Sequence, residues 1–427
     1  MKKAFFLAFL FLFLSCTNVS GKKKEDILQK LRSANRYEDS VIGEGARKSK
    51  RYKDAEELMN LCGDREMLKL LNDKSPVVKC YAANFIQDRN IEADWYNILL
   101  KQAEDYTSVK VYSFCSISDY YAGDFVLNSL FSKKLTDSEQ SKMKLELVKN
   151  QSKLNFANSI LLSQDMSDEL YAATRKWALK GNASAIFSLA KYKKTQDLQL
   201  IDSLKDKDID LFFKACQYNT RESLKPFLEE YMRSIMPKEH FYTEWKSFYK
   251  LVAVYHDDFS KKIFRLAFFD KVTARIRKYH LEFIYDAIKD YLDGFYDDYL
   301  KILWTKHNLV DKEIIDYFLL TDKEFALEGL KTALLNSNEY FFLFDTETLD
   351  YIIKAAYKNK IDLTEYFARA IKEDSVTTLE IYMKNMDCVQ AGNKTIVDAV
   401  KARLENESNR YVTGPLTKYL EDVSAEK

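Results

Sequence analysis

The stretch DKSPVVKCYAANFI, residues 73–86, carries the clearest fold signal in this chain. Pro76 is tolerated in the first turn of a helix, where a backbone N–H has no intrahelical partner to lose, and Asp73 can cap that helix. Ala82 and Ala83 are small enough to let the helix approach its neighbours closely. The stretch therefore predicts a turn followed by a helix that packs tightly against other helices.

A degenerate copy of this pattern follows 31 residues later (104 minus 73), with Glu104, Thr107 and Phe114 in place of Asp73, Pro76 and one alanine. The other matched positions are Val109, Lys110, Ser113 and Ile117. An acidic residue, a proline, a Val-basic pair and two small residues stand in an order that resembles a HEAT repeat. The resemblance implies stacked helix pairs and covers about 80 residues, from Lys53 to Phe131.

Helical periodicity continues beyond the motif. Apolar residues recur at i, i+3, i+4 and i+7 in Leu349, Ile352, Ile353 and Ala356. Ten glycines and four prolines in 427 residues are too few for a fold rich in strands or loops. We therefore expect an all-α fold, an α-solenoid of HEAT-like helix pairs, with a less regular helical bundle as the alternative in the C-terminal part.

Two capping boxes predict where individual helices begin. Thr136 with Glu139, and Thr321 with Glu324, each place a hydroxyl and a carboxylate three residues apart. In this arrangement the hydroxyl accepts from a backbone amide one turn on, while the carboxylate reaches back to the cap.

The N-terminus is typical of an exported lipoprotein. Met1–Lys3 is charged, Ala4–Leu14 is apolar, and Ser15-Cys16 follows. Eleven apolar residues are about half of what a helix needs to span a bilayer. The segment ending at Cys16 resembles a lipobox, which implies lipidation of Cys16 and a bacterial cell-envelope location; Thr17 after it resembles the pattern of lipoproteins passed to the outer membrane.

These patterns divide the chain into four parts. Residues 1–15 are the expected signal peptide, and residues 16–50 a lipid-tethered linker with a short helix and a loop from Glu38 to Lys50. Residues 51–236 are the expected HEAT-like helical repeats. Residues 237–427 are further helical repeats or a helical domain.

Charge and cysteine content exclude some classes of protein. The chain has 66 Lys plus Arg and 65 Asp plus Glu, a formal net charge of +1. A nucleic-acid-binding protein would carry a basic excess, so we expect no nucleic acid as partner. The cysteines other than Cys16 lack metal-ligand spacing and are expected to be small buried thiols, with a Cys62 to Cys80 disulfide as an alternative. They are Cys62, Cys80, Cys115, Cys216 and Cys388.

No arrangement of titratable residues predicts a metal, a cofactor or a catalytic residue. The four histidines do not form a His-Glu-x-x-His motif, and we interpret them as solvated surface residues. They are His240, His256, His280 and His307. Asp297 and Asp298 diverge by about 100° on a helix, so they fit a polar face better than a glycosidase pair. The Gly43–Ser49 stretch lacks the spacing of a phosphate loop.

The chain contains 28 Tyr and 28 Phe, which supply core material or a ligand platform. Their helical spacing favours the core. Representative positions are Phe264, Phe268, Tyr285, Phe341 and Phe342.

Together these features predict a membrane-tethered, extracytoplasmic helical-repeat protein that binds another protein as a scaffold or adaptor, and not an enzyme. Stacked helical units expose long surfaces suited to binding. One alternative is a glycan-capture lipoprotein of the nutrient-uptake type, against which the low Gly and Trp content argues. Another is an immunity or inhibitor protein directed against a toxin, and a third is a helical enzyme.

Overall fold

A computed structural model describes residues 21–163, 167–235, 244–269, 274–337 and 346–425. The chain forms two compact units, Met1–Asn219 and Thr220–Lys427, and each is considered by itself. The expected signal peptide, residues 1–15, and Cys16 lie outside the described residues, as do His240, Phe341 and Phe342.

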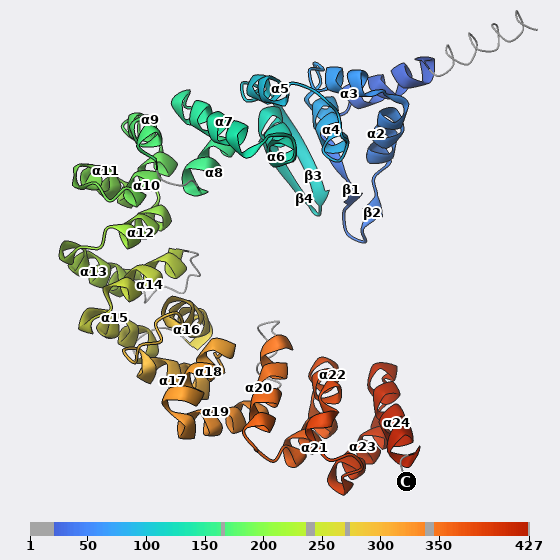
Figure 1. The fold of residues 1–427 in the computed structure, drawn as a ribbon, viewed down its shortest axis with the longest axis vertical. Coiled ribbons are helices and arrows are strands. Elements are labelled where there is room, and N and C mark those ends of the chain that lie inside the picture. Colours follow the sequence, from blue (N-terminus) through green and yellow to red (C-terminus); the bar gives the residue numbers. More distant parts are fainter. Residues whose placement is uncertain (1–20, 164–166, 236–243, 270–273, 338–345, 426–427) are drawn as a thin grey trace, which may run out of the picture. The chain divides into compact units, whose positions relative to one another are not determined.

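Unit 1 combines a small sheet with a series of helices (Figure 1). The strands are β1 Tyr37–Ile42, β2 Arg47–Lys48, β3 Ser108–Phe114 and β4 Ser116–Tyr121. The helices are α2 Lys50–Leu61, α3 Asp64–Leu70, α4 Pro76–Ile86, α5 Trp95–Gln102, α6 Ala122–Lys134, α7 Asp137–Lys149, α8 Asn155–Ser163, α9 Asp168–Ala178, α10 Ala183–Lys191, α11 Leu198–Asp202 and α12 Ile209–Tyr218.

The sheet has the strand order β2-β1-β3-β4. The β1 and β3 strands are parallel, whereas β1–β2 and β3–β4 are antiparallel hairpins. The buried Tyr37 of β1 packs against Tyr81 of α4 and Phe125 of α6, with ring centroids 4.5 Å and 4.8 Å apart. One face of the sheet is therefore anchored to the helices by aromatic side chains.

The sheet corrects two sequence predictions. The loop expected from Glu38 to Lys50 contains β1, β2 and the start of α2. The second HEAT-like copy is not a helix, because its positions Val109 to Ile117 form the β3–β4 hairpin. Val109 and Val111 are β-branched residues in alternation, and their preference for strand prevails over the motif register.

The first HEAT-like stretch, in contrast, does contain the predicted helix. Pro76 is the first residue of α4, and Ala82 and Ala83 are fully buried where α4 packs against its neighbours. Asp73 was expected to cap this helix, but Ser75 is its N-cap residue. Asp73 instead forms an ion pair with Arg32 at 2.7 Å.

Of the two predicted capping boxes, one is confirmed. The Thr136 side chain accepts from the Glu139 amide, and Glu139 accepts from the Thr136 amide at 2.9 Å. The second is wrong by one residue. Thr321 ends the preceding helix, and the Asp322 carboxylate caps the next one by accepting from the Phe325 amide.

The helix over residues 21–32 belongs to the packed body. Ile27, Leu28 and Leu31 are buried on this helix, which lies where the sequence predicts a short helix. The Lys24 ammonium lies 2.9 Å from the Glu66 carboxylate of α3. Residues 21–24 of the expected lipid-tethered linker are therefore helical.

Unit 2 is built from helices throughout its described residues (Figure 1). They are α13 Lys225–Ile235, α14 Glu244–Tyr255, α15 Asp258–Phe269, α16 Ala274–Ile288, α17 Asp297–His307, α18 Lys312–Thr321, α19 Lys323–Leu335, α20 Thr346–Lys358, α21 Thr364–Glu373, α22 Val376–Lys384, α23 Lys394–Asn406 and α24 Arg410–Ala425. The predominance of helix in both units confirms the helical fold class.

Within each unit, helices repeatedly pack against the next helix but one. In unit 1 this holds for the pairs α4–α6, α6–α8, α8–α10 and α10–α12. In unit 2 it holds for α14–α16, α18–α20, α20–α22 and α22–α24. This order of packing is typical of stacked helical pairs.

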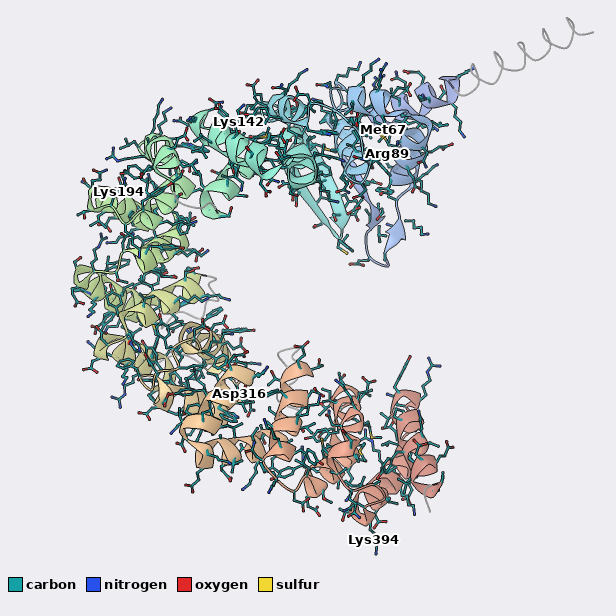
Figure 2. The ribbon with its side chains drawn as sticks, viewed as in Figure 1. Met67, Arg89, Lys142, Lys194, Asp316 and Lys394 are labelled. Carbon is teal, nitrogen blue, oxygen red and sulfur yellow. The ribbon has the colours of Figure 1, made fainter. Side chains whose placement is uncertain are left out.

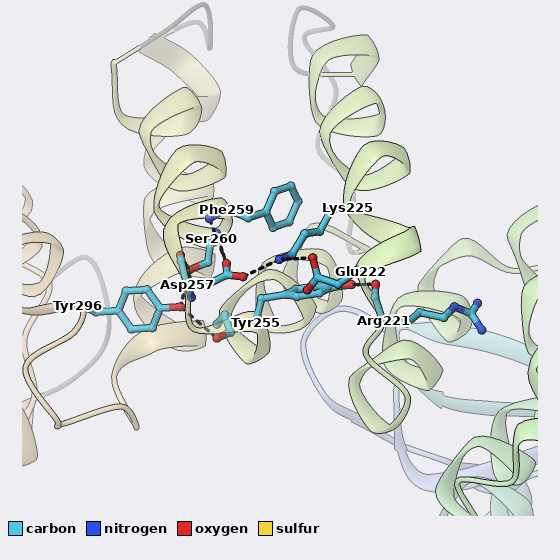
Figure 3. Close-up of polar contacts among 9 residues, drawn as sticks. Arg221, Glu222, Lys225, Tyr255, Asp257, Phe259, Ser260 and Tyr296 are labelled. Carbon is cyan, nitrogen blue, oxygen red and sulfur yellow. Dashed lines mark hydrogen bonds and ion pairs between the residues drawn. The ribbon is translucent and has the colours of Figure 1, made fainter.

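A lysine near the start of unit 2 joins its first turns to the following helices (Figure 3). The Lys225 ammonium lies 2.6 Å from the Asp257 carboxylate and 2.8 Å from Glu222. The Tyr255 hydroxyl donates to the Arg221 carbonyl at 2.8 Å. These contacts hold residues 221–225, near the start of the unit, against the end of α14 and the turn before α15.

Lysines also cover aromatic rings on the outside of unit 1. The Lys142 ammonium of α7 lies 4.5 Å from the centre of the Tyr96 ring, and Lys194 lies 3.5 Å from that of Tyr171. Figure 2 labels both lysines. Such contacts let long charged side chains cover apolar surface while their ammonium groups remain in contact with water.

Candidate protein-binding surface

The described histidines lie in separate structural environments. His256 Nε2 is 3.1 Å from Asp293 Oδ2, and not paired with its sequence neighbours Asp257 and Asp258. His280 is buried, which corrects its expected place on a solvated surface, and its Nδ1 is 2.9 Å from the Tyr249 hydroxyl. Within the described ranges, no two histidines contact each other.

Burial controls the charge of two of these histidines. It lowers the pKa of His280 to about 4, because the protonated ring would be isolated among aromatic side chains. Burial also lowers the pKa of His307, with a further contribution from nearby Arg277. His280 is therefore a neutral core residue that hydrogen-bonds Tyr249.

The carboxylates and glycines singled out in the sequence also have structural partners. Asp297 accepts from the Tyr317 hydroxyl at 3.0 Å, while Tyr296 and Tyr299 are buried beside it, as expected for a polar helix face. Gly43 and Gly45, both with positive φ, form the turn between β1 and β2.

Most of the described cysteines are buried, as expected from the sequence. Cys62, Cys80, Cys216 and Cys388 are buried, whereas Cys115 is exposed in the β3–β4 turn, and the alternative disulfide between Cys62 and Cys80 is not formed. In the ranges that the structure describes, no three His, Cys, Asp or Glu side chains could together hold a metal ion. The expected Phe264, Phe268 and Tyr285 core positions are buried.

A pocket of about 320 Å³ in unit 2 was not predicted from the sequence. Burial raises the pKa of Glu282 at its wall. The neighbouring Asp286 is 2.8 Å from Lys246 and 3.4 Å from Lys289, and these cations lower the pKa of its carboxyl against the effect of burial. The lysines hold this carboxylate in an ion-pair network between helices.

Among the described residues of unit 1, the β3–β4 hairpin places three large apolar side chains close together on the surface. Phe114 is 70 % exposed, Ile117 52 % and Tyr120 39 %. Figure 1 shows the hairpin extending past helices α4 and α6. Side chains of this size are usually buried, and their concentration on one short segment is typical of a surface that binds a partner.

The turn of the hairpin holds Phe114 in a strained conformation. Its φ is 48°, in the left-handed region that is rare for a bulky residue, and its carbonyl accepts from the Gly43 amide. A two-residue turn normally places glycine or asparagine at such a position. Retaining an exposed phenylalanine there costs free energy without a packing gain, which is common at functional sites.

The base of the hairpin, unlike its tip, is firmly held. Val109 is buried, and the Ala122 amide donates to the Thr107 carbonyl at 2.8 Å. Gly123 packs so closely that an added Cβ would lie 2.4 Å from the Gln102 carbonyl oxygen. The exposed residues are therefore presented from a rigid base.

Sequence reasoning missed this surface for an identifiable reason. The turn residues are Phe114 and Cys115, so the Asn-Gly or Asp-Gly signal of a hairpin is absent. The alternation of Val109 and Val111 with polar residues was the one available signal.

Comparison with known proteins identifies no relative: no family model, no curated protein and no solved structure matches this chain. A search of the described helices for a long apolar segment finds none able to cross a membrane.

Proposed function

We propose that this chain is a lipid-tethered, extracytoplasmic helical-repeat protein that acts by binding another protein. The exposed β3–β4 hairpin is the observation that carries the binding part of this proposal. Lipidation at Cys16 and an outer-membrane location rest on the N-terminal sequence pattern. The next-but-one packing of helices supports the solenoid arrangement.

The hairpin suits binding because its tip exposes apolar side chains while its base is packed against the helices. Phe114 and Ile117 offer apolar area that would be removed from water on contact with a partner. The packed base around Val109 lowers the entropy lost when a partner docks, since the strands are already ordered. The partnered histidines and carboxylates favour binding over catalysis.

Photocrosslinking in the intact envelope tests the proposal. Phe114 is replaced by p-benzoylphenylalanine, and the same photoreactive residue at Leu179, which is 60 % exposed in the same unit, serves as the control. We expect one protein to crosslink from position 114 and not from position 179. The double variant Phe114→Ser, Ile117→Ser, pulled down in parallel, should lose that protein. Equal crosslinking from both positions, or none from position 114, would contradict the proposal.

A further inference from the structure

One hydrogen bond at the end of β4 identifies which of its residues are hydrogen-bonded to β3. The Ala122 amide donates to the Thr107 carbonyl, and these two residues lie opposite each other when the β3–β4 register is extended by one residue beyond the Ser108–Tyr121 pair. Hydrogen-bonded and non-hydrogen-bonded pairs alternate along an antiparallel ladder. The bonded pairs are therefore Val109 with Tyr120, Val111 with Ser118, and Ser113 with Ser116.

The intervening residues of β4 direct their backbone groups away from β3. These residues are Ile117, Asp119 and Tyr121. Among the described residues no strand pairs with this side of β4, because the sheet order ends there. Ser116 to Tyr120 are all exposed, so no helix covers the edge. The three N–H groups and the C=O groups of Ile117 and Asp119 thus form a template for one more strand, whereas the Tyr121 carbonyl begins helix α6.

The edge lacks the usual protection against pairing. Exposed edge strands are commonly blocked by lysine, proline, a bulge or short length. The β4 strand has six residues, contains no lysine or proline, and pairs with β3 in an uninterrupted register. Its only charged residue is Asp119.

The side chains define the partner strand. Ile117, Asp119 and Tyr121 share one face of β4, and Asp119 forms no ion pair with any residue in the described ranges. An antiparallel strand would place one residue opposite each of them. A basic residue would complement Asp119, and apolar or aromatic residues would complement Ile117 and Tyr121.

We propose that the free edge of β4 binds an extended segment of the partner protein by antiparallel strand addition, with a basic residue opposite Asp119 and an apolar or aromatic residue opposite Ile117. The inference rests on the proposed protein-binding function and specifies its partner. Backbone hydrogen bonds supply affinity in this mode, and the alternate side chains supply specificity.

The sequence of β3 provides a probe, since Lys110 already lies opposite Asp119 and Tyr112 opposite Ile117 on the inner side. A labelled, N-acetylated peptide with the β3 sequence, SVKVYSF, is titrated into the full-length protein in detergent.

Two methylated versions of this peptide form a matched pair. One carries N-methyl groups on the amides that correspond to Ser108, Lys110 and Tyr112 of β3. The other carries them on the alternate amides, which are the first valine, the second valine and the second serine of the peptide. We expect only the first pattern to abolish binding, because that edge of the peptide faces β4.

Substitutions in β4 itself test the same interaction between the strand and the peptide. Ile117→Pro removes an outward N–H without removing a β3–β4 hydrogen bond, so binding should be lost while circular dichroism is unchanged. Asp119→Lys should weaken binding about fivefold, whereas Ser118→Lys, on the opposite face, should leave it unchanged.

Equal binding of the two methylated peptides, or no binding of the parent peptide at about 1 mM, would overturn strand addition. If crosslinking from position 114 persists in that case, the proposed protein-binding function stands and only its mode is wrong. If peptide binding follows the expected pattern but no envelope protein crosslinks, the edge is confirmed as a strand-binding site and the proposed function fails.

Discussion

The Asp124 carboxylate of α6 caps a different helix, because its Oδ1 accepts a hydrogen bond from the Phe156 amide of α8 at 2.8 Å. Asp124 is fully buried and no cation neutralises it in the described structure. The residue therefore joins two helices at the cost of a buried carboxylate.

This arrangement predicts an unusual pH dependence. Burial raises the pKa of Asp124, so the folded protein binds this proton more tightly than the unfolded chain does. The contribution of the protonated Asp124 carboxyl to the free energy of unfolding is complete below the ordinary pKa of about 3.9. It is lost as the pH rises through the pKa of the folded state.

Asp124→Asn, which keeps an acceptor oxygen, should be at least as stable as wild type at pH 7. Asp124→Ala should lose about 1–2 kcal/mol. Denaturant unfolding at pH 7 measures both, and a less stable asparagine variant would contradict the prediction.

His280 should make the free energy of unfolding depend on pH in the opposite direction to Asp124. Its pKa is lowered to about 4 in the fold, so its contribution is present above the ordinary value of about 6.5. That contribution, about 3 kcal/mol at most, is lost as the pH falls through about 4. His280→Gln should flatten the loss of stability over this range, as monitored by thermal melts. An unchanged profile would show that another group is responsible.

Gly329 is expected to resist enlargement. A Cβ at this position would lie 2.8 Å from the Trp304 ring, which is fully buried. Gly329→Ala should therefore overpack the contact between α19 and α17 and cost about 1–3 kcal/mol. Gly414→Ala is the matched control, because nothing lies within 4 Å of its Cβ position. Equal unfolding free energies for the two variants would refute the packing argument.

The small residues of α4 should behave similarly. Ala83 is fully buried where α4 packs against neighbouring helices, so Ala83→Leu should lower the free energy of unfolding by about 1–3 kcal/mol. Lys101→Leu, at an exposed position of α5, should leave it nearly unchanged. Chemical denaturation distinguishes these outcomes, and wild-type stability of the Ala83 variant would mean that the helix can move aside.

Membrane attachment is predicted to depend on Cys16. Because the charged start, the short apolar run and Ser15 precede this cysteine, Cys16→Ala should release the protein from the membrane fraction or leave an unprocessed precursor. Mass spectrometry and detergent partitioning measure the change. Identical mass, processing and partitioning in the variant would argue against lipidation.

The sequence by itself determined the helical fold class, because sparse glycine and proline and apolar spacing at i, i+3, i+4 and i+7 are local properties. It also located Thr136 as a helix start and Ala82 and Ala83 as buried. It did not determine the β3–β4 hairpin. Val109 and Val111 fit a strand by local preference, but the parallel pairing of β3 with β1 joins segments about 70 residues apart.

Tertiary structure also decided which polar residues are buried. His280 and Asp124 have no sequence feature that predicts burial, since burial depends on helices packed around them. The free edge of β4 likewise exists only because the sheet ends there. A sequence records which backbone groups can form hydrogen bonds, whereas only the assembled sheet determines which of them have no partner.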